Sequence, residues 1–250
     1  MNILRKFIRR FGKKQKHASS ATEPLMHRVY LFDELLARAG RDFFASKRIL
    51  EIGPKDGLDS KRFASLQPDE LVMIDLPEKR ATVDKWLGEI SCRHQYIENN
   101  LMYMPSEDIL SLGRFDLIWC TGVLYHNAEQ LRLLRKLYRL LKKDGYLVLE
   151  SATLRLSKKL VDKPYVEIHY PQTYRNTGTI THLPSASAIK AWLQMVGFQE
   201  IIDSACYEKE NKDLIGQRYA CIARKSNEDD ADFYYGKSGL NPVYKFGDSV

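Results

Sequence analysis

Residues 48–57, Arg-Ile-Leu-Glu-Ile-Gly-Pro-Lys-Asp-Gly, are the most informative stretch of this chain. An apolar run ends in a loop with two glycines, and a segment able to form a helix follows. This pattern predicts a buried strand that enters a tight turn, where the backbone can approach a ligand closely. We expect the strand at 48–52 and the turn between Glu51 and Gly57.

A second strand-like run, at 70–75, ends in the acid Asp75, which follows Gly57 by eighteen residues. A carboxylate at the tip of the neighbouring parallel strand can accept hydrogen bonds from both hydroxyls of a ribose. The two features together predict a nucleoside cofactor. The loop is not the dinucleotide fingerprint, because Lys55 stands where that pattern has its middle glycine. An ordinary tight turn in an α/β domain is the alternative.

Strand-like and helical segments alternate along the chain. We expect strands at 48–52, 71–75, 94–98, 115–120, 146–150, 198–206 and 218–223, and helices at 24–39, after Gly57, and at 77–90, 104–112, 128–143 and 185–196. Asn127 and Gln130 would form a capping box for the helix at 128–143. The alternation, with a final hairpin-like pair, predicts an α/β fold with a doubly wound seven-stranded sheet, mostly parallel with one antiparallel edge strand.

The chain divides into three parts by composition. Residues 1–23 form a basic tail and linker, residues 24–224 form the α/β domain, and residues 225–250 form a C-terminal tail. Within the domain, residues 151–185 carry polar aromatic side chains among prolines and have no clear period. We expect there an irregular insertion that serves as a lid or substrate platform.

The net charge of +7 comes from the N-terminal tail alone. Residues 1–16 hold seven cations and no acid, so the remainder has 39 − 7 = 32 basic residues against 32 acidic ones. A neutral body argues against a wide nucleic-acid surface, which needs many phosphate contacts, but leaves room for a local patch. The hydrophobic content of 44% is enough for a sizeable core.

The same tail has a helical period. Five apolar residues fall on one face of such a helix: Ile3, Leu4, Phe7, Ile8 and Phe11. Cations fill most of the other positions. This pattern predicts a helix lying on an anionic membrane surface, and hence a cytoplasmic protein held peripherally at the inner membrane face. A helix docked on the body, an RNA-binding arm and an organelle-targeting presequence are the alternatives. No apolar run reaches the length of a membrane-spanning helix.

The four cysteines, Cys92, Cys120, Cys206 and Cys221, show no metal-ligand spacing. Cys120 and Cys221 lie in apolar strand-like runs, so we expect buried free thiols and a reducing compartment. Clustered acids are missing near the expected site, and we expect no metal.

The spacing Glu51-x-Gly53-x-x-x-Gly57 resembles the first motif of class I S-adenosylmethionine (SAM) methyltransferases. Further along, the segments FDLIWCTGVLYH, LKKDGYLVLES, LPSASAIKAWLQMVGF and RYACIARK resemble the methyltransferase domain of the bacterial tRNA wobble-uridine carboxymethyltransferase family, over roughly residues 47–224. The resemblance implies a Rossmann-like methyltransferase fold with SAM as cofactor. Two departures, Lys55 in the glycine loop and Thr-Gly-Thr-Ile-Thr-His-Leu at 177–183, make plain SAM the expected donor rather than its carboxylated form.

This resemblance assigns roles at the carboxyl edge of the sheet. Glu51, Gly53, Lys55 and Gly57 would hold the methionyl part of SAM, with Lys55 as a partner for its carboxylate or as a solvated loop lysine. Asp75 would accept the ribose hydroxyls, Asn100 and Leu101 would flank the adenine, and Thr121 and Gly122 would line the methionine end.

On the acceptor side we choose Tyr125 and His126 as catalytic residues. His126 would act as the base, because the ordinary pKa of histidine lies near neutrality. The alternative role for His126 is to cap the following helix. His169, Tyr170 and His182 from the insertion are weaker candidates.

Three functions remain open from the sequence. The first is methyl transfer to a small molecule, a sugar or a lipid-linked acceptor, which the tail and the neutral body favour. The second is a tRNA-modifying (carboxy)methyltransferase acting on wobble uridine, which the family resemblance favours. The third is a non-catalytic protein with the SAM-binding fold.

Overall fold

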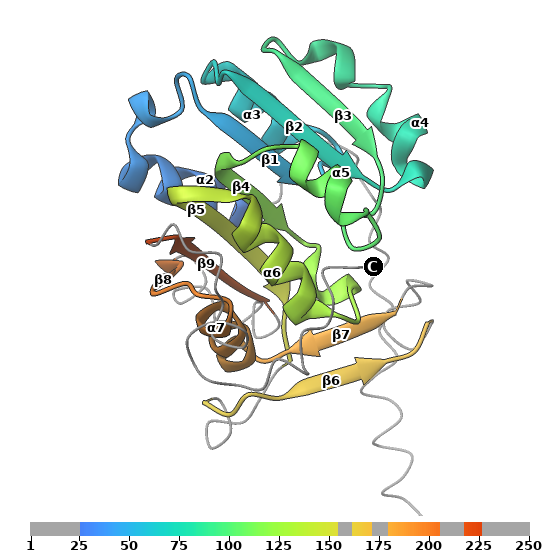
Figure 1. Ribbon diagram of the computed structural model, residues 1–250, viewed down its shortest axis with the longest axis vertical. Coiled ribbons are helices and arrows are strands. Elements are labelled where there is room, and N and C mark those ends of the chain that lie inside the picture. Colours follow the sequence, from blue (N-terminus) through green and yellow to red (C-terminus); the bar gives the residue numbers. More distant parts are fainter. Residues whose placement is uncertain (1–25, 155–161, 172–179, 206–217, 227–250) are drawn as a thin grey trace, which may run out of the picture.

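The computed structural model describes residues 26–154, 162–171, 180–205 and 218–226 (Figure 1). The predictions for residues 1–23, for Cys206 and for most of the C-terminal tail lie outside these ranges. Lys225 is described. It is buried and donates hydrogen bonds to the carbonyl oxygens of Tyr138 and Leu141, so the folded domain includes this residue.

The main sheet has seven strands in the order β3-β2-β1-β4-β5-β9-β8. Their bounds are Arg48–Ile52 (β1), Glu70–Asp75 (β2), His94–Glu98 (β3), Phe115–Thr121 (β4), Leu141–Ala152 (β5), Glu200–Asp203 (β8) and Arg218–Arg224 (β9). Strands β1 to β5 pair in parallel, and β9 runs antiparallel to both β5 and β8. The predicted seven-stranded, mostly parallel sheet is confirmed. Its single antiparallel strand, β9, lies next to the edge strand β8.

Helices cover both faces of this sheet (Figure 1). They are α2 (Met26–Ala39), α3 (Leu58–Ser65), α4 (Arg80–Val83), α5 (Ser106–Ser111), α6 (Gln130–Leu140) and α7 (Ala186–Met195). One buried cluster joins Leu134 of α6 and Ile189 of α7 to Leu50 of β1. The other cluster joins Leu35 of α2 and Phe63 of α3 to the opposite face of the sheet. Because successive strand residues point to opposite faces, the apolar strands supply both cores.

The predicted helix at 77–90 is wrong as a single element. The segment forms a 3₁₀ turn (η2, Pro77–Lys79), the short helix α4 and a second 3₁₀ turn (η3, Leu87–Glu89). The break follows from Trp86, whose indole turns inward and donates to the carbonyl oxygen of Lys55 at 3.2 Å. A tertiary contact thus overrides the local helical pattern.

The predicted helix at 128–143 is shorter than expected and lacks the capping box. Helix α6 spans Gln130–Leu140, and its N-cap residue, Glu129, makes no side-chain cap. The Asn127 side chain bonds instead to the carbonyl oxygen of Val123. At the other end, residues 141–145 join β5, because Leu141 pairs with Phe115 of β4.

The insertion at 151–185 is not irregular throughout. It contains a separate two-stranded antiparallel sheet, with β6 at Val166–His169 and β7 at Thr181–Pro184. Figure 1 shows this hairpin beyond the main sheet, next to the end of α6 that carries Gln130. The four-residue strands are too short for a clear period in the sequence.

Cys120 and Cys221 are buried free cysteines, as predicted, and Cys92 is a half-buried free cysteine. Burial raises the pKa of Cys120 and of Cys221 to about 12 each. Within the described ranges no helix is both long and apolar enough to cross a membrane.

Candidate active site

The turn after β1 contains three residues in the left-handed conformation. The angle φ is +69° at Gly53, +54° at Lys55 and +72° at Gly57. Glycine adopts this conformation without strain, whereas most residues with a side chain disfavour it. Lys55 is the residue here that is not glycine, and the hydrogen bond from Trp86 to its carbonyl oxygen helps to hold it in this conformation. A Cβ atom at Gly57 would lie 2.3 Å from Cδ2 of Trp86, so only glycine fits there. The Lys55 side chain is exposed.

Asp75 lies beside this turn at the end of β2. Its Oδ1 accepts a hydrogen bond from the amide of Leu76 at 2.8 Å. Burial raises the pKa of Asp75, and hydrogen bonds from the amides of Leu76 and Lys55 act in the opposite direction. The acid therefore lies next to the glycine turn, which is where a carboxylate that accepts hydrogen bonds from a ribose is expected.

The loop after β3 is also fixed by hydrogen bonds. Oδ1 of Asn100 accepts from the amide of Met102 at 3.0 Å, and Leu101 is buried. Lys136 of α6 donates to the carbonyl oxygens of Leu101 and Met102 at 2.9 and 2.7 Å. The loop thus keeps a defined shape where the adenine is expected.

Gly122, after β4, sits where four elements approach one another. Its φ is +74°, and its amide donates to the carbonyl oxygen of Glu150 at 3.0 Å. A Cβ atom there would lie 3.0 Å from Nη2 of Arg28 and 3.9 Å from Nη2 of Arg218. Arg28 also donates to the carbonyl oxygen of Thr121 at 3.2 Å. The backbone at 121–122 is thus held by a guanidinium group from α2.

Arg218 links this turn to the expected acceptor side. Its Nη2 donates to Oε2 of the fully buried Glu150 at 3.0 Å, and its Nε also donates to the same carboxylate. Its guanidinium carbon lies 5.8 Å from the centre of the Tyr125 ring. The ion pair and the ring contact together fix Tyr125 relative to β5 and β9.

Glu51 lies beneath the glycine turn rather than on its surface. Its buried carboxylate accepts a hydrogen bond from Oγ of Ser60 at 2.5 Å. Burial and the nearby Asp59 raise the pKa of Glu51 to about 8. Asp59 accepts in turn from Nε1 of Trp119 at 3.1 Å and from Arg28 at 3.4 Å. This geometry suits Glu51 to an indirect role, in which it holds the turn and α3 together.

Tyr125 and His126 lie on a 3₁₀ turn, η4 (Leu124–His126), directly after the turn at Gly122. Their ring centres are 4.0 Å apart. Burial lowers the pKa of His126, and the cations of Arg218 and Lys79 lower it further. His126 does not provide the N-cap of α6, which is Glu129. A neutral imidazole beside the donor turn is the form that can accept a proton.

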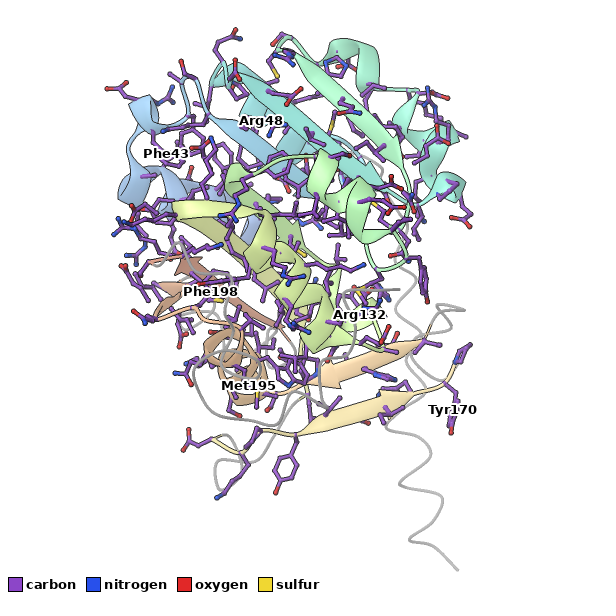
Figure 2. All side chains as sticks on the ribbon, in the orientation of Figure 1. Phe43, Arg48, Arg132, Tyr170, Met195 and Phe198 are labelled. Atoms are coloured by element: carbon purple, nitrogen blue, oxygen red, sulfur yellow. The ribbon has the colours of Figure 1, made fainter. Side chains whose placement is uncertain are left out.

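The weaker candidates lie on the hairpin. Nε2 of His169 lies 3.2 Å from Oε1 of Glu167, and Tyr170 is exposed at the end of the strand (Figure 2). The carbonyl oxygen of His182 accepts from Nε2 of the buried Gln130 at 2.7 Å. The same amide group donates to the carbonyl oxygen of Leu124 at 3.2 Å. Gln130 therefore ties the hairpin to η4.

The residues at this edge fit a nucleoside cofactor such as SAM. The left-handed turn brings backbone close to the tip of β1, and Asp75 offers a carboxylate beside it. Across the described ranges, no group of three or more His, Cys, Asp and Glu side chains could hold a metal ion. The individual roles assigned to the site residues, and the absence of a metal, stay predictions.

Sequence reasoning missed Arg28, Trp86, Gln130 and the pair of Glu150 and Arg218. Each stands in an ordinary helical or strand pattern, and each becomes part of the site through a contact distant in sequence. A glycine that must adopt a left-handed conformation can be recognised from the residues around it. A contact between side chains far apart in sequence leaves no such local pattern.

Comparison with known proteins places this geometry in a family. A family model described as a methyltransferase domain matches residues 25–202. A tRNA U34 carboxymethyltransferase from Desulforapulum autotrophicum is 30% identical over 159 residues, which cover 62% of this chain and 45% of that protein. One from Helicobacter pylori is 37% identical over 86 residues, 34% of this chain and 30% of that protein. This chain spans less than half the length of these curated relatives.

Solved structures share the fold. One is the N-terminal domain of EvdMO1, crystallised in the presence of D-fucose and SAH, the demethylated product of SAM. It superposes with a TM-score of 0.61 at 19% identity, and the match covers 88% of this chain and 97% of that one. A putative SAM-dependent methyltransferase from Listeria monocytogenes superposes with a TM-score of 0.57 at 15% identity, covering 80% of this chain and all of that one.

This chain therefore belongs to the methyltransferase-domain family. The predicted class, a SAM-dependent methyltransferase with a Rossmann-like sheet, is confirmed, and SAM is the cofactor of that class.

Proposed function

We propose that this protein transfers a methyl group from SAM to a small-molecule or sugar acceptor that binds between η4 and the β6–β7 hairpin. The observation that carries the proposal is the position of Tyr125 and His126. They follow the turn at Gly122 directly, and Gln130 ties their turn to β7. An acceptor in this place would be flanked by the base on one side and by the hairpin on the other.

SAM supplies an electrophilic methyl group on a sulfonium, so the protein mainly has to align the acceptor and exclude water. The glycine turn and Asp75 would hold the cofactor. Tyr125, packed against His126, would orient the acceptor. His126, kept neutral by burial and neighbouring cations, would take the proton that an attacking hydroxyl loses. The hairpin would limit access of water.

Two features favour a small acceptor over a nucleic acid. The body of the chain, without residues 1–16, has equal numbers of acidic and basic residues. A structural neighbour, EvdMO1, was crystallised with a sugar, D-fucose, present. A lipid-linked sugar would also suit a tail that lies on a membrane.

The test begins with the donor. Calorimetric titration with SAM, SAH and carboxylated SAM should show binding of SAM and SAH, with SAM preferred over its carboxylated form. Transfer of label from methyl-labelled SAM should then be screened against sugars, phenols and isoprenoid-linked glycans, with His126→Ala as control. SAM binding without transfer to any acceptor would favour the non-catalytic alternative. Failure to bind SAM or SAH would contradict the proposal.

A second candidate is carboxymethyl transfer to the wobble uridine of tRNA. The curated relatives bear that name. The guanidinium groups of Arg28 and Arg218 approach Gly122, where the methyl end of the donor is expected, and a carboxyl group on that methyl would add a negative charge beside them. Both cations already have carboxylate partners, Asp59 and Glu150, which reduces the attraction.

This candidate is tested by the same titrations. Tighter binding of carboxylated SAM than of SAM, together with salt-dependent retention on tRNA, would favour it over the first proposal. Retention that persists without residues 1–16 would place the tRNA contact on the body. Equal or weaker binding of carboxylated SAM would exclude it.

A further inference from the structure

The β6–β7 hairpin presents an apolar outer face. Residues directly opposite each other in an antiparallel pair point to the same side, and the buried Thr181 and Leu183 lie opposite His169 and Glu167. The even-numbered residues of β6 therefore point away from the body. They are exposed: Val166 by 39%, Ile168 by 63% and, one position past the strand, Tyr170 by 76%. Figure 2 shows Tyr170 at the outer end of the hairpin.

β6 is also an edge strand. In the described part of the chain it pairs with β7 alone. The amide of Ser185 donates to the carbonyl oxygen of Tyr165 at 2.8 Å, which shows that the odd-numbered residues direct their backbone groups toward β7. Because these directions alternate along a strand, Val166 and Ile168 direct their N–H and C=O groups toward the open edge. Pro184, opposite Val166, has no N–H to offer.

Strand β6 reads Val-Glu-Ile-His, with no lysine and no proline inside it, so its edge can accept a further strand. The strand is short and Pro164 and Pro171 lie on either side, so any added strand pairs with residues 165–170 alone. A two-stranded sheet has little stability by itself, whereas three or more strands with an apolar face are stable. The edge and its apolar face therefore suit a further strand.

The strand is complementary to a second copy of itself in one register. The backbone N–H and C=O groups at the open edge belong to even-numbered residues. Two antiparallel β6 strands can therefore form backbone hydrogen bonds only if even-numbered residues lie opposite even-numbered residues. Centring the pair on Glu167 would oppose two carboxylates, and centring it on His169 would oppose two imidazoles. Centring it on Ile168 places Glu167 opposite the partner's His169, and by symmetry His169 opposite the partner's Glu167. The same register sets Val166 against the partner's Tyr170 on the apolar face.

We propose that two copies of this chain associate through β6, forming a four-stranded antiparallel sheet in which Ile168 lies opposite the partner's Ile168. The inference does not depend on the nature of the methyl acceptor. Since Gln130 joins β7 to η4, the added strands would also steady the hairpin next to Tyr125 and His126.

Cysteine cross-linking tests both the dimer and its register. Opposed residues in this geometry have Cα atoms close enough for a disulfide. Under mild oxidation Ile168→Cys should give a covalent dimer on a non-reducing gel. Val166→Cys and Tyr170→Cys should each stay monomeric alone and cross-link when the two variants are mixed. Wild type and Leu110→Cys, at an exposed position far from the hairpin in sequence, are the controls.

Sedimentation velocity provides the independent measurement. Wild type should sediment as a dimer, Glu167→Lys should shift to monomer, and Glu167→Lys combined with His169→Glu should restore the dimer because the charges are exchanged. Wild type that is monomeric at all concentrations would overturn the proposal. So would a dimer in which Ile168→Cys does not cross-link, or in which Val166→Cys cross-links with itself.

Discussion

At the scale of single residues, Asp75 is the group that distinguishes a nucleoside site from an ordinary turn. Its carboxylate sits beside the glycine turn and accepts from the amide of Leu76. Hydrogen bonds to a charged group contribute about 1.5–3 kcal/mol, so Asp75→Ala should weaken SAM binding about 10- to 150-fold. Calorimetric titration measures this, with Asp84→Ala as an exposed acidic control. Equal affinity in wild type and Asp75→Ala would remove the ribose assignment.

The raised pKa of Glu51 predicts that the stability of the protein depends on pH, which can be tested without cofactor or acceptor. The pKa of Glu51 rises from an ordinary 4.5 to about 8 on folding, because the carboxyl is buried. Between these values the folded state holds a proton that the unfolded state has lost, so stability falls as pH rises from 4.5 to 8. Glu51→Gln keeps the shape and removes the titration. Urea unfolding across this range should show a smaller loss for Glu51→Gln than for wild type. Parallel stability curves would contradict the shift.

His126 makes the prediction closest to the chemistry. If it is the base, His126→Ala should lower the turnover number about 10²–10⁴-fold, while SAM affinity stays near wild type. Its pKa is lowered below the ordinary 6.5, so the neutral, active form persists under mildly acidic conditions. The acid limb of the turnover–pH profile should therefore lie below pH 6.5. A full turnover number in His126→Ala would leave the residue without a catalytic role.

At the scale of elements, one buried amide holds the hairpin to the site. Gln130 donates to the carbonyl oxygens of Leu124 and His182, so Gln130→Glu would set a carboxylate against two carbonyls. We expect a loss of about 1–3 kcal/mol in unfolding free energy, with a raised KM for the acceptor. Chemical denaturation measures the first effect. The adjacent exposed Glu129→Gln should change stability by less than about 0.5 kcal/mol. Equal stability of both variants would show that the tie is unimportant.

At the scale of the whole molecule, we propose that residues 1–16 attach the protein to anionic membrane surfaces. The segment holds seven cations, each of which contributes about 1 kcal/mol near such a surface and less at high salt. Full-length protein should co-sediment with anionic liposomes at low salt, and a variant lacking residues 1–16 should not. Turnover of a soluble acceptor should be retained in that variant. If full-length protein stays in the supernatant, the proposal fails.

Local chemistry makes part of this protein predictable from its residues. Apolar runs predicted β1, β2, β4 and β5, with glycine turns directly after β1 and β4, and the spacing of Gly53, Gly57 and Asp75 predicted where a nucleoside cofactor would bind. These signals are readable because a left-handed turn needs glycine and a buried parallel strand needs a continuous apolar run. The supporting contacts around the site depend instead on tertiary packing. Trp86 breaks an expected helix to close over the glycine turn, and Arg28 and Arg218 converge on Gly122 from distant segments. Their side chains act through contacts between segments far apart in sequence, and no local period records such contacts.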